Sequence, residues 1–150
     1  MLVKDVGVRS PAQGAVLVSV LSSEAGNGTP RNDVLNAVRA RLGRKDIKPL
    51  TVALTVQAAQ ITAIDVTLTL VIPAGPDPLL IKAASEASIR AYAAERHEVG
   101  KIWRANGLIA AAKVPGVEDV SALSPSVDVD PGPDGAVYMQ SLAVTVVTGG

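Results

Sequence analysis

The sequence predicts an α+β fold of two small packed units, with helices on mixed or antiparallel sheets. The element order is β-β-α-β in the first unit and β-α-α-β-β in the second. Three observations predict it. Apolar and polar residues alternate along 61–72, which is typical of a strand with one buried face. The proline-rich segment 73–78 ends that strand and opens a long helical pattern. Elsewhere, turn-forming residues separate short Val-rich runs from helical patterns.

The first unit is predicted to cover residues 1–57 and the second residues 58–150. Strands are expected at 3–9 and 15–21, where a turn at Gln13-Gly14 favours a hairpin. A helix over 32–43 and a strand over 50–57 follow. Residues 58–60 separate the units and lack the Gly, Ser and Pro of a flexible linker.

The second unit is organised around the strand and the helix that residues 61–98 contain. Asp77 followed by Pro78 is a helix start, because a carboxylate caps free N–H groups and proline suits the first helical position. Within the helix, small residues recur at intervals of three and four, which favours close packing on the sheet. That predicted inward stripe is Leu80, Ala84, Ala87, Ala91 and Ala94.

The rest of the second unit is predicted as one more helix followed by strands. The helix covers 101–113, with Ile102, Ala105, Ile109 and Ala112 inward. Strands are expected at 117–123 and 137–147, with 126–130 as a candidate for a further short strand.

Composition excludes several classes of protein. Fourteen basic and fourteen acidic residues cancel, which argues against a broad basic surface for nucleic acid. No cysteine is present, so disulfides and thiolate metal sites are excluded. No apolar run approaches the ~18 residues of a membrane-spanning helix, and residues 1–10 lack a signal-peptide pattern. We therefore expect neither nucleic acid nor a membrane as a partner.

Two segments resemble ligand loops, and each has an ordinary interpretation that we favour. Residues 23–28 contain Gly26-x-Gly28 between a strand and a helix, but the third glycine and the lysine of a phosphate loop are missing. Asp128, Asp130 and Asp134 could offer oxygen ligands to calcium, but two intervening prolines break the EF-hand spacing. A plain loop and a plain turn are the expected structures.

The remaining polar candidates do not form a catalytic constellation. His97 is the only histidine and is expected on the surface near the end of the long helix. The basic cluster is expected to be a solvated face or a protein contact. The sequence thus predicts no enzyme, no cofactor and no bound metal. The cluster comprises Arg39, Arg41, Arg44, Lys45 and Lys48.

Trp103 has two open interpretations: a core residue, or an exposed anchor for a partner. As candidate contacts with a partner protein we take Trp103, Ile102, Arg39, Arg41, Arg44 and Lys48.

The order of several short motifs resembles the baseplate J-like proteins of contractile phage tails, over almost the whole chain. No single motif is specific, but their order and spacing are. They run from Val3 to Pro11 and Val20-Leu21-Ser22, through 46–51, Val56-Gln57, Pro73 to Pro76, Ala83-Ala84, Ala91-Tyr92, Val99-Gly100 and Ala110-Ala111, to Val114-x-Gly116-Val117, Ser124-Pro125, Asp128 and Val146-x-Thr148-Gly149-Gly150.

The resemblance is to the C-terminal half of those proteins, so the sequence is expected to be a piece or a short version of one. It implies a structural role in the wedges of the baseplate, in the virion, after assembly in the host cytoplasm. The implied partners are further copies in neighbouring wedges, a tail protein I-like chain, the hub or spike, and the sheath. Contact with a host would then rearrange the ring and trigger sheath contraction.

Two departures from the family pattern stand out. Lys48 precedes Pro49 where the family usually has arginine, which weakens any bidentate pairing there. Ile102-Trp103 and Asn106 stand where the second helix usually begins with Asp and a later Ser. The alternatives from other classes are a small α/β ligand- or phosphate-binding domain or enzyme that uses residues 23–28, and a tail assembly factor absent from the mature particle.

Overall fold

The computed structural model describes residues 3–11, 15–23, 26–42 and 53–149. These residues form two three-stranded sheets and the helices that pack on them, which confirms the α+β class and the predicted element order. The chain divides into two compact units. The first holds residues 1–62, 98–101 and 131–136, and the second holds 63–97, 102–130 and 137–150. The separation into domains 1–57 and 58–150 stays a prediction.

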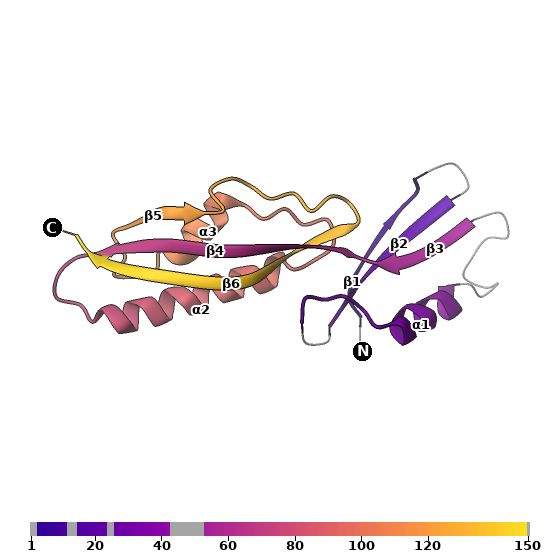
Figure 1. Cartoon of the computed structure of the whole chain (residues 1–150), viewed down its shortest axis with the longest axis horizontal. Coiled ribbons are helices and arrows are strands. Elements are labelled where there is room, and N and C mark those ends of the chain that lie inside the picture. The colour runs from indigo at the N-terminus through magenta and orange to yellow at the C-terminus, as the bar shows by residue number, and fades with distance from the viewer. Residues whose placement is uncertain (1–2, 12–14, 24–25, 43–52, 150) are drawn as a thin grey trace. The chain divides into compact units, whose positions relative to one another are not determined.

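The first unit is a mixed sheet with the order β1-β2-β3 (Figure 1). Strand β1 (Val3–Arg9) pairs antiparallel with β2 (Ala15–Ser22), as the hairpin prediction requires, and β3 (Ala53–Ala58) pairs parallel with β2. Helix α1 (Asn32–Leu42) connects β2 to β3 and buries its apolar side on one face of the sheet. That core consists of Val18, Val20, Leu35 and Val56, with Val38 and Leu42 packed against it.

The second unit is a sheet with the order β5-β4-β6 (Figure 1). The central strand β4 (Gln60–Ile72) pairs antiparallel with β5 (Asp119–Ser124). Strand β6 (Gly135–Thr148) runs in the same direction as β4 (Figure 1). Gly149, just beyond the end of β6, donates its N–H to the carbonyl of Ile72, the last residue of β4, over 2.9 Å. The predicted alternation holds, because every second side chain of β4 from Val66 to Ile72 is buried.

Helix α2 (Pro78–Arg96) begins as predicted. The Asp77 carboxylate accepts a hydrogen bond from Leu79 N (3.0 Å), and Pro78 occupies the first turn. The corner before it needs a glycine, because Gly75 has a φ of 120° that side-chain-bearing residues rarely adopt.

The predicted inward stripe of α2 is wrong. Leu80, which is 70% exposed, and the four alanines of the stripe all lie on the outer face of the helix. The opposite face is buried and consists of Ile81, Ser85 and Ile89, where the Ser85 hydroxyl donates to Ala112 O over 2.9 Å. The branched isoleucines fill far more core volume than alanines, so they determine which face packs inward.

The second helix is shorter than predicted. Helix α3 runs over Ala105–Ala112, and residues 101–104 precede it in non-helical backbone. Ala105 and Ala112 are buried as expected, but Leu108 takes the inward place assigned to Ile109. No strand forms at 126–130. Instead Val129 makes an isolated antiparallel bridge with Trp103, with both N···O distances at 2.9 Å.

None of the helices in the described ranges is long and apolar enough to cross a membrane.

Replacing Ile89 by Ala tests which face of α2 is the core face. Ile89 is fully buried, so we expect a loss of about 2–5 kcal/mol in the free energy of unfolding. The matched control, Ala84→Ser on the outer face, should change stability by less than about 1 kcal/mol. Urea denaturation of dilute protein measures both. Equal effects of the two substitutions would contradict the orientation of the helix.

Candidate interaction surface

An arginine–aspartate pair ties the turn before β6 to the first sheet. Arg9 Nε lies 2.7 Å from Asp134 Oδ1, and its Nη2 lies 2.6 Å from Oδ2, so the pair is bidentate. Ser19 of β2 donates to the same carboxylate over 3.4 Å. These two carboxylate partners lie on neighbouring strands, and Arg9 is 125 positions from Asp134 in the sequence.

The charges of this pair shift each other's ionisation. The hydrogen bonds from Arg9 lower the pKa of the Asp134 carboxyl. The positive charge of Arg9 and the hydrogen bond from Ser19 lower it further. The hydrogen bond to Asp134 raises the pKa of Arg9. Both groups are therefore charged throughout the physiological pH range.

A second segment, residues 98–101, is attached to the same unit through β1. The Asp5 carboxylate accepts a hydrogen bond from Val99 N over 2.8 Å. Gly7 is required for this approach, because a Cβ at that position would collide with the Val99 side chain. Gly100 N donates to Gly135 O over 2.7 Å, so the segments 98–101 and 131–136 are bonded to each other.

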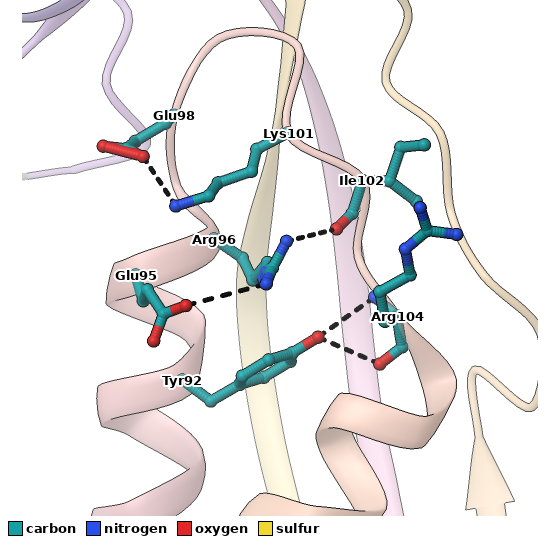
Figure 2. A network of polar contacts seen from close by, with 7 residues as sticks. All are labelled: Tyr92, Glu95, Arg96, Glu98, Lys101, Ile102 and Arg104. Atoms are coloured by element: carbon teal, nitrogen blue, oxygen red, sulfur yellow. Dashed lines mark hydrogen bonds and ion pairs between the residues drawn. The ribbon is translucent and has the colours of Figure 1, made fainter.

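In the second unit, Tyr92 on α2 fixes the backbone that leads into α3 (Figure 2). Its hydroxyl donates to Arg104 O and accepts from Arg104 N, both at 3.0 Å. Arg96 lies one turn further along α2 and donates to Ile102 O over 3.3 Å. The guanidinium of Arg96 is also 5.5 Å from the centre of the Tyr92 ring, within cation–π range.

Asp128 caps helix α3 from a distant part of the sequence. Its Oδ1 accepts a hydrogen bond from Ala105 N and its Oδ2 accepts one from Arg104, both at 2.9 Å. The backbone N–H of Ala105, followed by the Arg104 side chain, lowers the pKa of the Asp128 carboxyl. The residue at the cap position itself, Arg104, makes no side-chain cap.

Trp103 is a core residue and not an exposed aromatic side chain, which decides between the two interpretations of the sequence. It is 1% exposed, and its ring contacts that of Tyr92 edge to face, with ring centroids 5.0 Å apart. The backbone N–H and C=O of Trp103 both form hydrogen bonds with Val129, so this residue is extended. Helix α3 therefore starts only after Arg104. The indole N–H has no acceptor among the described residues.

The other candidate contact residues are spread over both units. Ile102 is half-buried in the second unit. In the first unit Arg41 is exposed, and Arg39 donates to Val56 O on β3 over 2.8 Å as well as to Asn36. Arg44, Lys45 and Lys48 lie outside the described residues, so the predicted basic cluster is described only in part. That Ile102 and these basic residues contact a partner protein remains a prediction.

The candidate ligand residues make contacts within the fold. Asp128 and Asp134 each bind an arginine, in different units. His97 is half-buried at the end of α2, with Nδ1 3.0 Å from Val137 O, and is therefore less exposed than predicted. In the loop, Gly26 and Gly28 have φ angles of 113° and 92°. No group of three or more potential metal ligands occurs in the described ranges.

Sequence reasoning missed the roles of Arg9, Asp5 and Tyr92. Their partners lie 125, 94 and 12 positions away, and no local pattern marks such pairs. The turn-forming residues at 130–135 indicated a turn, but not what it would bind.

Comparison with known proteins adds a relative. The chain is 35% identical over 127 residues to baseplate protein J of Escherichia phage P2. The matched segment covers 85% of this chain and 42% of the relative. The chain is baseplate J-like. The similarity confirms the resemblance predicted from the motif order, and the chain spans less than half of that relative's length. No protein-family profile matches the sequence.

Replacing Gly107 by Ala in this baseplate J-like chain tests how closely α2 and α3 pack. A Cβ at Gly107 would collide with the Tyr92 ring and hydroxyl. Alanine normally stabilises a helix interior by roughly 0.5–1 kcal/mol over glycine, but here we expect a loss of about 1–3 kcal/mol. Chemical denaturation measures the change. Combining it with Tyr92→Leu removes the collision, so the two effects should be strongly non-additive. A stabilised Gly107→Ala variant would contradict the packing.

Acid should selectively remove the contribution of Asp134. A carboxyl whose pKa is lowered on folding stabilises the native state above its unfolded pKa of about 3.9, and this contribution is lost as pH falls through the folded pKa. Asp134→Asn should therefore be less stable than the parent at neutral pH, and the gap should shrink as the pH is lowered below about 4. Thermal unfolding across this range measures it. Asp33→Asn, at an exposed carboxylate on α1, is the control; a gap independent of pH would refute the role of the charge.

Proposed function

We propose that the chain is a structural subunit of the baseplate wedge in a contractile phage tail or a phage-tail-like particle. It takes part in baseplate assembly and in the rearrangement that triggers sheath contraction. The observation that carries this proposal is the 35% identity to a phage baseplate protein over 85% of the chain. Since the chain corresponds to 42% of that relative, the role proposed is that of the matched part.

The way polar residues are used supports a mechanical role. Arg9 with Asp134, and Arg104 with Asp128, join segments that are distant in the sequence. Such pairs make each unit resist deformation, because bidentate or capping geometry fixes the segments they join. Rigid units of this kind suit a ring that rearranges by moving bodies past each other.

The proposed partners are other baseplate and tail proteins. They include a tail protein I-like chain, neighbouring wedges, the hub or spike, and the sheath, and copies of this chain associate within the baseplate. We assign no enzymatic activity, nucleic acid or membrane to this role. The proposed contact residues are Ile102 in the second unit and, in the first unit, the basic residues Arg39, Arg41, Arg44 and Lys48.

The test is co-assembly with particles. A tagged copy of the chain, expressed with the tail proteins encoded beside it, should co-purify with intact tails and be detected there by mass spectrometry. Deleting its gene should leave tails without complete baseplates in negative-stain micrographs. A variant with both Arg39 and Arg41 replaced by Ala should assemble less efficiently, whereas Asp33→Ala, on the same helix, should assemble normally.

Other outcomes would contradict the proposal. A chain required for tail formation but absent from mature tails would be an assembly factor. A clear rise in melting temperature with nucleotides, phosphate or a metal would favour a ligand-binding domain that uses residues 23–28.

A further inference from the structure

The two faces of the first sheet are covered in different ways. One face carries the apolar core under α1. Gly7 and Ser19 pair across β1 and β2 and lie on the opposite face, because side chains alternate along a strand. That face is covered by residues 98–101, which lie against Gly7, and by residues 131–136, which bond to Ser19. We call these two segments of the first unit the clasp.

The face of the sheet beneath the clasp is mostly polar. Ser19 is fully buried there and donates to Asp134 over 3.4 Å, while Gln57 donates to Ser19 over 3.4 Å. In the apolar cluster on this side, Leu21 is buried together with two alanines. Polar groups that lose the clasp can bond to water instead. Uncovering this face therefore costs less free energy than uncovering the valines under α1.

Polar bonds hold the clasp to the rest of the first unit. The Asp5 carboxylate accepts from Val99 N over 2.8 Å. Arg9 binds both carboxylate oxygens of Asp134, and the carbonyl of Asp134 accepts from Gln60 N over 2.9 Å. The bidentate pair combines charge with two parallel hydrogen bonds, so Arg9 is the main polar restraint on the clasp.

The clasp is also closed by bonds of its own. In the first segment, Lys101 Nζ lies 2.8 Å from Glu98 Oε1 (Figure 2). In the second segment, Gly135 N donates to Gly132 O over 3.3 Å. The bond from Gly100 N to Gly135 O joins the two segments. The clasp therefore moves as one body when its bonds to the sheet break.

The residues that flank the clasp are fixed within the second unit. His97 Nδ1 lies 3.0 Å from Val137 O, and Trp103 forms two backbone hydrogen bonds with Val129. All four residues belong to the second unit, so these contacts persist when the clasp leaves the first sheet. Residues 62 and 63 then remain as the only covalent connection between the two units.

We propose that the clasp is a conformational switch, which leaves the first sheet as one body while both units stay folded, and that the Arg9–Asp134 pair holds it closed. With the clasp closed, both of its segments tie the first sheet to the chain of the second unit. With the clasp open, a single connection at the start of β4 remains, which allows the rigid-body type of rearrangement. The inference rests on the proposed function only where it assigns this motion to a baseplate.

Hydrogen exchange of single amides, followed by NMR on the full 150-residue chain, tests whether the clasp opens. Val99 and Gln60 donate the backbone bonds that opening breaks. Their amides should have the same protection factor, because one event exposes both. It should lie at least about ten-fold below that of Trp103, whose bond to Val129 persists. Equal protection of all three amides would show that only unfolding releases the clasp, and would overturn the inference.

Replacing Arg9 by Ala tests what holds the clasp closed. The protection of Val99 and Gln60 should fall together by about three- to ten-fold, while that of Trp103 stays unchanged. Arg9→Lys keeps the charge but loses the two-point bond, so its effect should be intermediate. Arg41→Ala, which removes an exposed arginine of α1 in the same unit, is the matched control and should change none of these amides. A loss of protection at Gln60 alone, or an equal loss at Trp103, would overturn the switch.

A disulfide can lock the clasp, since the chain has no cysteine of its own. A Cβ added at Gly7 would lie 3.3 Å from Val99 Cβ, close to the roughly 3.5–4.5 Å between the Cβ atoms of a disulfide. In the Gly7→Cys, Val99→Cys double variant, oxidation should raise the protection of Gln60 by at least about ten-fold, and reduction should reverse the change. Gln60 exchange that is indifferent to oxidation would contradict opening as one body.

The same double variant separates this inference from the proposed function. In tails that contain it, oxidation should block sheath contraction and reduction should restore it. Contraction that is indifferent to the disulfide would refute the use of the clasp in the baseplate rearrangement. A chain that is missing from purified tails would refute the proposed function and leave the exchange results standing.

Discussion

The second unit depends on the burial of one face of β4. Val66, Leu68, Leu70 and Ile72 are all at most 2% exposed, and the strand is paired on both sides. The buried face of β4 determines which side of α2 packs inward, because Ile81 and Ile89 belong to the same apolar cluster as these four residues. Trp103 and Leu108 belong to the same cluster and so fix where α3 begins.

The first unit depends more on polar contacts between distant segments. Its apolar core on the α1 side has four buried residues, and the segments 98–101 and 131–136 are held by Asp5, Arg9 and Ser19. An exposed ion pair contributes little by itself. Here the bidentate geometry, the backbone bond from Gln60 N to Asp134 O and the glycine at position 7 act together, so the segment is fixed in one register.

The candidate interaction surfaces of this chain are the apolar side chains and the strand edge that remain exposed in the folded structure. Catalytic sites usually concentrate perturbed ionisable groups in a cleft, but the carboxyl groups with lowered pKa values here are Asp128 and Asp134, which bind arginines in different units. What remains exposed includes the apolar start of α2, the alanine face and the uncharged edge of β6. These features suit binding to another protein chain, which agrees with the relationship to a baseplate protein.

The sequence by itself determined the elements and their order, because hydrophobic periodicity, prolines and the Asp77-Pro78 cap act locally. It also determined the family resemblance, because the spacing of short motifs is a property of the linear chain. Only the tertiary structure decided which face of α2 is buried, since both faces are apolar enough to satisfy a helical period and core volume selects the isoleucines. It alone decided that Trp103 sits in a bridge to Val129, because pairing with a segment 26 positions away overrides local helix propensity. The Arg9–Asp134 pair likewise required the fold, since opposite charges 125 positions apart carry no mark of their proximity until the chain is packed.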